Sequence, residues 1–150
     1  MNLERKILIS HRGNINGKNE LLENNPDYIE VALSKGYDVE IDLWIENDGF
    51  YLGHDAPTYP ITLDWLIERS LKLWVHCKDF TSLSELINTE MRIFYHQNED
   101  YTIISDGHIW AHNLTKVDDK CIIPLLNKKE LKNWKGTDVY GICSDYVGVW

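Results

Sequence analysis

Short apolar runs that alternate with amphipathic segments constrain the fold of this chain more than any other feature. Lys6 to Ser10 (KILIS) and Leu73 to Cys77 (LWVHC) are short and largely apolar, as buried strands are. Tyr37 to Ile45 (YDVEIDLWI) alternates polar and apolar residues and predicts another strand. Asn25 to Lys35 (NPDYIEVALSK) predicts a helix, because it starts with capping residues and a glycine follows it.

The rest of the chain continues this alternation in shorter pieces. Strands are also predicted at 50–52, 92–95, 101–104, 108–111, 121–126 and 139–143, and helices at 62–69, 81–88 and 128–134. Alternating strands and helices predict an α/β protein with a mostly parallel sheet. This number of strand candidates favours a barrel, although a full (β/α) barrel usually needs ~200 residues or more.

We therefore expect one domain over residues 1–150, folded as a small or reduced TIM barrel with shortened helices in its second half. An open doubly wound sheet is the alternative.

Charge and composition exclude several classes of protein. A net charge of -9 and a pI of about 5.0 do not suit a protein that coats nucleic acid. No stretch reaches the ~18 apolar residues of a membrane span. The apolar run near the N-terminus is too short for a signal peptide. Three widely spaced cysteines do not form a disulfide framework, so we expect a reducing, cytoplasmic setting.

Polar residues gather where the predicted strands end. In a barrel, the carboxyl ends of all strands meet at one mouth, where active sites are built. The residues concerned are His11, Arg12, Glu40, Asp42, His54, His76, Lys78, His96, Gln97 and Asp145.

Glu40 and Asp42 are two residues apart in a strand, so their side chains share one face. A carboxylate pair directed inward from a buried strand is costly unless a cation neutralises it. Oxygen ligands of this kind suit Mg²⁺, Ca²⁺ or Mn²⁺. The alternative is an edge strand on which both carboxylates face solvent.

His11 and His54 could serve as general base and general acid, because imidazole titrates near neutral pH. Phosphodiester cleavage needs both roles, one at the attacking hydroxyl and one at the leaving oxygen. Arg12 offers a planar fork for phosphate oxygens. The alternatives are two structural histidines and an arginine in a surface salt bridge.

Five elements in order resemble the N-terminal signature of glycerophosphodiester phosphodiesterases, a family of the phospholipase-C-like phosphodiesterase superfamily. They are HRG at 11–13, ENN at 23–25, VEIDLW at 39–44, the Asp48-Gly49 turn and GHD at 53–55. The resemblance covers roughly residues 6–57. It implies a TIM barrel with the site at its mouth, an acid/base pair of His11 and His54, a phosphate ligand in Arg12, and metal ligands in Glu40 and Asp42.

The resemblance also assigns Glu23 and Asn24 to the mouth, where they help to bind substrate. The family usually carries Glu-x-Lys on the third strand, with the Glu completing a Mg²⁺ or Ca²⁺ site. This chain has His76-Cys77-Lys78 there, so Lys78 matches and His76 departs. A histidine ligand suits Mn²⁺ or Zn²⁺ better. His96 and Gln97 follow a later strand and are further candidates for contacts to the substrate.

The sequence thus predicts a metal-dependent phosphodiester hydrolase that acts on a small phosphodiester. Its alternatives are a lyase that forms a cyclic phosphate, a barrel that binds a phosphorylated ligand without chemistry, and another zinc hydrolase. No helix is predicted after the last strand, so an apolar outer face could be covered in a homodimer.

Overall fold

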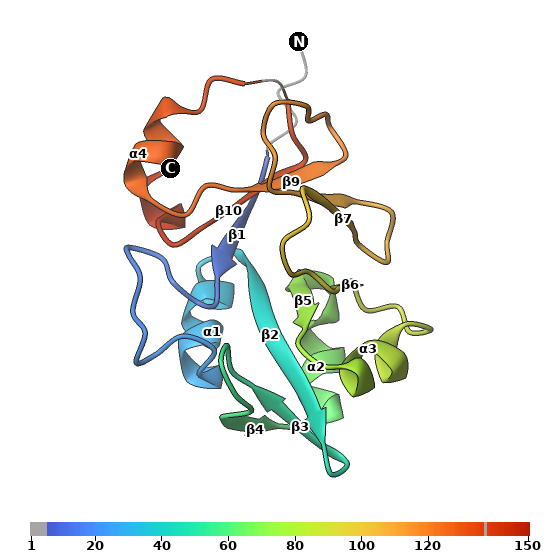
Figure 1. The fold of residues 1–150 in the computed structure, drawn as a ribbon. Coiled ribbons are helices and arrows are strands. Elements are labelled where there is room, and N and C mark those ends of the chain that lie inside the picture. Colours follow the sequence, from blue (N-terminus) through green and yellow to red (C-terminus); the bar gives the residue numbers. More distant parts are fainter. Residues whose placement is uncertain (1–5, 137) are drawn as a thin grey trace.

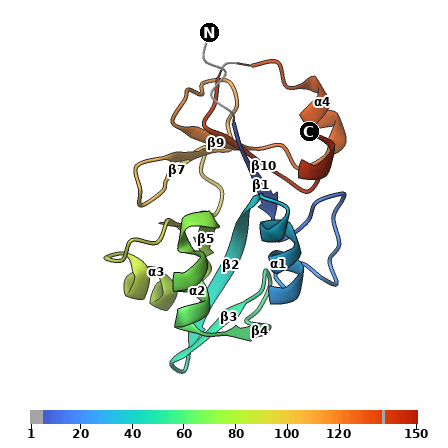
Figure 2. The ribbon, with the colours of Figure 1, turned by 180° about the vertical axis from the view of Figure 1, so that it is seen from behind.

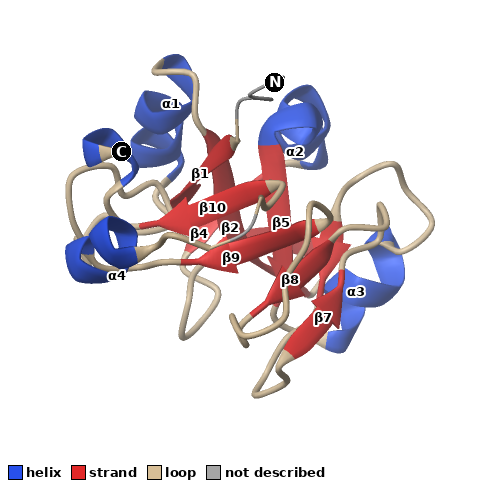
Figure 3. Ribbon diagram, turned by 90° about the horizontal axis from the view of Figure 1, so that it is seen from above, coloured by secondary structure: helices blue, strands red, loops and turns tan. Residues whose placement is uncertain are grey.

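A computed structural model describes residues 6–136 and 138–150, and in it ten strands join into one curled sheet (Figures 1 and 3). Its main path runs β4-β3-β2-β1-β10-β9-β8-β7, and β5 pairs with β2 and β6. The strands are β1 (Ile7–His11), β2 (Asp38–Glu46), β3 (Gly49–Leu52), β4 (Tyr59–Ile61), β5 (Leu73–Cys77), β6 (Ile93–Phe94), β7 (Tyr101–Ile103), β8 (Ile109–Ala111), β9 (Cys121–Pro124) and β10 (Gly141–Ser144).

The prediction of a mostly parallel TIM barrel is wrong. The sheet is mixed, because β2–β3, β3–β4 and β7–β8 pair antiparallel while the other strand pairs of the described residues are parallel. The sheet is also open: across the described residues, no ladder joins β6 to β7 or β8. Instead Ser105 bridges the gap, where its N–H donates to the carbonyl of Ile93 at 2.9 Å and its hydroxyl accepts from the N–H of Ile93 at 2.9 Å.

Short strands explain why the sheet stays open. β6 has only two residues and β8 only three, too few for the continuous ladder that closes a barrel. The chain also places a hairpin, β7–β8, where a barrel would have a helical crossover. The structure is therefore a curled half-barrel rather than a ring of strands.

Three helices cover the outer face of β2 and β5 (Figure 2). They are α1 (Pro26–Ser34), α2 (Leu63–Arg69) and α3 (Phe80–Leu86), and a 3₁₀ turn, η1 (Ser70–Lys72), follows α2. Each is capped as its sequence suggests; the side chain of Asn25, for example, accepts the N–H of Asp27 at 2.9 Å. Buried residues from all three helices pack with Val39, Ile41 and Leu43, three odd-numbered residues of β2.

The opposite face of β2 therefore points into the half-barrel, and with it Glu40 and Asp42. Below them the interior is filled by aromatic and aliphatic side chains: Ile9, Trp74, Phe94, Ile104, Trp110, Ile122 and Cys143. The inner face of β2 thus carries two carboxylates next to an apolar core.

The outer face of β8, β9 and β10 is covered by a second apolar layer. It includes Leu131 of α4 (Lys128–Asn133) and, from loops, Leu114 and Trp134. A last 3₁₀ turn, η2 (Val147–Val149), packs through Val147 with the helices of the first layer. This outer face, whose expected exposure was the reason to predict a homodimer, is thus covered by the chain itself. The homodimer stays a prediction, but this face no longer supports it. Within the described ranges, no helix is long and apolar enough to cross a membrane.

Candidate functional site

The site lies at the carboxyl ends of β1, β5 and β10, beside the middle of β2, and in the loops that follow β1 and β3. Parallel pairing aligns these ends: His11 is opposite Glu40, and Asp42 is opposite His76. Strands far apart in sequence therefore bring their polar residues to one edge of the sheet, as predicted for a barrel, although the sheet does not close.

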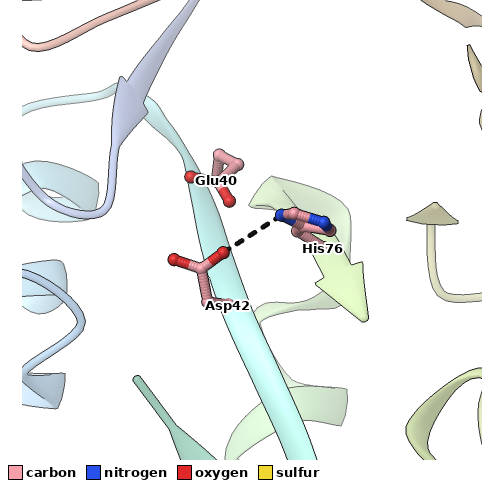
Figure 4. A group of neighbouring side chains, drawn as sticks. All are labelled: Glu40, Asp42 and His76. Carbon is pink, nitrogen blue, oxygen red and sulfur yellow. Dashed lines mark ion pairs between the residues drawn. The ribbon is translucent and has the colours of Figure 1, made fainter. Parts of the chain in front are cut away.

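Glu40, Asp42 and His76 form the centre of the site (Figure 4). The two carboxylates project from β2 toward the imidazole on β5, and one ligand atom from each of the three residues lies within 4.8 Å of the others. Asp42 is fully buried and Glu40 is 3% exposed. Among the described residues, Glu40 Oε2 and Asp42 Oδ1 are buried oxygens with no hydrogen-bond partner. Such oxygens are expensive to bury unless a cation satisfies them.

The two carboxyl groups titrate in opposite directions. Burial raises the pKa of Glu40 well above its usual value, and the neighbouring charge of Asp42 raises it further. Burial alone would raise the pKa of Asp42 as well, but its interactions with His54, His76 and Arg12 outweigh burial and hold that pKa well below its usual range. Asp42 is thus the permanent anion of the pair.

The hydrogen bonding of His76 exposes a ligand atom to these oxygens. Its Nε2 lies 3.2 Å from the carbonyl oxygen of His96, and only a protonated nitrogen can bond to a carbonyl. Its Nδ1 lies 3.1 Å from Asp42 Oδ1, which is also an acceptor, so this nitrogen becomes a ligand when a cation takes the place of the proton between the two atoms. The ring also stacks on Phe94, with centroids 5.1 Å apart. This is how proteins orient metal-binding histidines. The donors fit a divalent cation, and a set of two carboxylates and one imidazole suits Mn²⁺ or Zn²⁺.

His11 is held from behind by Asp145, the residue after β10. Its Nδ1 lies 2.7 Å from Asp145 Oδ1, and its Nε2 lies 3.7 Å from Glu40 Oε2. Burial would raise the pKa of Asp145, but the hydrogen bond from His11 and its charge outweigh burial and lower that pKa. The anchored ring thus directs Nε2 to the centre of the site.

Arg12 adopts a left-handed backbone conformation (φ 59°), and so does Asn24 (φ 65°). Such angles are strained for residues with a Cβ and tend to occur at functional sites. Arg12 Nη1 donates to Glu23 Oε2 at 3.0 Å, and Arg12 Nε forms an ion pair with Asp42 Oδ2 at 3.0 Å. Asn24 clamps Asp42 twice: its Nδ2 donates to Oδ2 at 2.9 Å, and its Oδ1 accepts the backbone N–H at 3.0 Å. Glu23 and Asn24 therefore position Arg12 and Asp42.

His54 lies in the loop between β3 and β4, at the outer rim of the site. Its Nδ1 is 3.7 Å from Asp42 Oδ2, and 43% of its side chain is exposed. The loop turns tightly at Gly53, where a Cβ would collide with the carbonyl of Ala56. His54 and His11 thus lie on different sides of the carboxylate pair, one exposed and one anchored.

The remaining predicted residues contribute unequally. Lys78 is half-buried, and its charge acts on Glu40 in the direction that lowers the pKa of that carboxyl. His96 contributes its backbone carbonyl to His76, while its ring stacks on His112 at 3.9 Å. Gln97 is exposed, and its side-chain amide donates to the hydroxyl of Tyr95 at 2.8 Å. The structure therefore places Lys78 at the site, His96 behind it, and Gln97 away from it.

Asn14 is the residue that sequence reasoning missed. It is fully buried in the loop after β1, and its amide contacts both Glu23 and Asp145. Its only sequence signal is its place directly after His11-Arg12-Gly13, because an amide in a loop follows no periodic pattern.

A scan of protein-family models found no match, and neither did searches of curated proteins and of solved structures.

Proposed function

We propose that this protein is a divalent-metal-dependent phosphodiesterase, with its site at Glu40, Asp42 and His76. The observation that carries the proposal is the convergence of Glu40 Oε2 and Asp42 Oδ1, both buried without a hydrogen bond, on Nδ1 of His76. A divalent cation bound by these atoms would polarise a phosphate oxygen and offset its charge.

Two histidines with different surroundings supply the proton transfers. His11, anchored by Asp145, presents Nε2 on the inner side of the carboxylates and acts as the base toward water or a substrate hydroxyl. His54 is exposed at the rim and protonates the leaving alkoxide.

Arg12 provides the contact to phosphate oxygen. Its Nε and Nη1 are directed to Asp42 and Glu23, so Nη2, which takes part in neither contact, is assigned to the substrate. Lys78 adds a second positive charge beside Glu40. The order of motifs between residues 11 and 55, which resembles glycerophosphodiester phosphodiesterases, supports the same roles for His11, His54 and Arg12.

Phosphorus NMR on a panel of small phosphodiesters tests the proposal. Purified protein is treated with chelator and then assayed with Mn²⁺, Zn²⁺, Mg²⁺ or Ca²⁺. We expect metal-dependent conversion to a phosphomonoester. A cyclic phosphate signal would instead assign a substrate hydroxyl as the nucleophile.

The matched variants are His11→Ala and His108→Ala. His108 lies directly before β8, where its Nδ1 is 2.8 Å from Asp106 Oδ2 and its ring is tilted by 35° against that of Tyr140, with centroids 3.9 Å apart. We expect turnover to fall by about 10²-fold or more in His11→Ala and to persist in His108→Ala. Phosphate binding without turnover by the metal-loaded wild type on the whole panel would contradict the enzyme and favour a binding protein.

A further inference from the structure

We propose that Asn14 and Asp145 are the positioning residues of this site, and that together they fix the tautomer and direction of His11. Their side chains form hydrogen bonds with other residues, not with Glu40, Asp42 or His76, so both act on the site indirectly. The inference rests on the proposed function for its catalytic consequence and on hydrogen-bond geometry for its structural part.

The orientation of the Asn14 amide is determined by its neighbours. Its Nδ2 donates to Glu23 Oε1 at 3.1 Å and to Asp145 Oδ1 at 2.9 Å. Its Oδ1 accepts from the N–H of Asn19 at 3.1 Å and from the hydroxyl of Tyr28 at 2.9 Å. An amide group has two N–H bonds and two lone pairs, and all four are used here. Turning the amide over would direct oxygen at two carboxylates, so the orientation is unique.

This amide determines how Asp145 meets His11. Asp145 Oδ1 accepts from Asn14 on one side and lies 2.7 Å from His11 Nδ1 on the other. A carboxylate can only accept, so Nδ1 carries the proton and the lone pair of the neutral ring is at Nε2. That nitrogen is the one directed at Glu40 Oε2. The tautomer that a base needs is thus imposed from the far side of the ring.

The same amide also supports the other half of the site. Glu23 accepts from Asn14 through Oε1 and from Arg12 through Oε2. Arg12 in turn pairs with Asp42. One buried side chain therefore joins two branches, one ending at the base and the other at the arginine and a carboxylate. Fully satisfied polar networks of this kind make a site rigid.

The test is nitrogen-15 NMR of the His11 imidazole in metal-free protein, at a pH where the spectrum itself shows a neutral ring. We expect the wild type to carry its proton on Nδ1. Asp145→Leu removes the acceptor at similar volume and should shift the larger share of the proton to Nε2. Asp145→Asn keeps an acceptor oxygen and should retain the Nδ1–H form.

Asn14→Asp places a third carboxylate against Glu23 and Asp145 and should also change the His11 tautomer. Its matched control is Asn25→Asp, which adds the same charge at the N-cap of α1 and keeps the helix cap. If Asn14→Asp does not fold, Tyr28→Phe removes one of the four bonds to the amide from a half-buried position and should measurably enlarge the Nε2–H fraction.

Kinetics separate a positioning role from a merely structural one. With a phosphodiester that the wild type cleaves, Asp145→Leu should lower kcat about 10- to 100-fold with KM within about twofold, and Asp145→Asn should recover most of that loss. A wild-type His11 with its proton on Nε2, or a tautomer unchanged in Asp145→Leu, would overturn the inference. If the wild type cleaves nothing, the proposed function fails, while the tautomer still decides the role of Asp145.

Discussion

Strand β2 carries carboxylates at its start and at its middle, on the same inner face, and their surroundings differ. Asp38, at the start of the strand, accepts from Trp74 Nε1 at 2.9 Å and has Lys72 and Arg92 each at 3.7 Å. Arg92 also lies over the Trp74 ring, 3.8 Å from its centroid. Four residues later, Asp42 Oδ1 is buried without a hydrogen bond, as is the nearby Glu40 Oε2.

Under the proposed function, the difference separates a structural carboxylate from one that binds a metal ion. At the amino ends of the strands, the protein supplies every partner that Asp38 needs. At the site, Asn24 and Asn14 hold neighbouring carboxylates in place by hydrogen bonds. One oxygen of Asp42 and one of Glu40 nevertheless have no hydrogen bond. Buried polar atoms in native proteins are rarely left in that state without a function.

The largest expected effect comes from replacing the carboxylates of Asp42 and Asp38, one in each of two variants. Asp42→Asn should lower metal-dependent turnover by about 10³-fold or more, because it removes the permanent anion of the site. Asp38→Asn should leave turnover within about twofold of the wild type. Phosphorus NMR rates at saturating Mn²⁺ check both variants. Equal losses of turnover in the two folded variants would mean that Asp42 and Asp38 do not differ in function.

For the stability of the fold, by contrast, we expect a clear effect at the amino end of β2. Trp74→Phe removes the N–H that bonds to the buried Asp38, and leaving that oxygen short of a partner should cost about 1–3 kcal/mol in the free energy of unfolding. Urea denaturation followed by fluorescence measures the loss. Unchanged stability would show that Asp38 is satisfied by solvent or by Lys72 and Arg92 alone.

Glu40→Gln should have a smaller effect of opposite sign in metal-free protein. Burial and Asp42 raise the pKa of Glu40, so its folded pKa exceeds its unfolded value of 4.5. Stability of the wild type then falls as pH rises above that unfolded value, because the unfolded chain releases its proton first. The variant lacks this loss and should be more stable by up to about 1 kcal/mol at neutral pH. Denaturation with chelator present, compared at several pH values, tests the sign; a destabilised variant at neutral pH would refute it.

The smallest effect concerns His112, next to the site. Burial, together with the charges of His96 and His76, lowers the pKa of His112 to about 4. As pH falls from the usual value of 6.5 to about 4, the unfolded chain takes up this proton first, so stability declines across that window and levels off below it. The carbon-13 shift of the His112 ring in chelated protein gives the pKa directly. Titration near 6.5 would show that the stacked pair is fully hydrated.

Much of the site could be predicted because strand periodicity is local. The alternation in β2 places Glu40 and Asp42 on one face, and its partner strands then bring His11 and His76 opposite them. That the barrel stays open could not be predicted in this way. An apolar run such as Ile93–Phe94 or Ile109–Ala111 does not reveal how long its ladder will be or which strand it will pair with.

Two omissions have similarly physical causes. Strand β4 was not predicted; Pro60 is its middle residue, and a proline inside a strand is confined to edge strands such as this one. The role of Asn14 depends on contacts to Glu23 and Asp145, nine and 131 residues away, and long-range hydrogen bonds leave no mark on a single sequence.

Calorimetric titration of chelator-treated protein with Mn²⁺ tests the central claim most directly. We predict one binding event per chain that is lost in Asp42→Asn and His76→Leu and retained in Asp38→Asn. Absence of binding to the wild type, or binding that survives both Asp42→Asn and His76→Leu, would contradict the account.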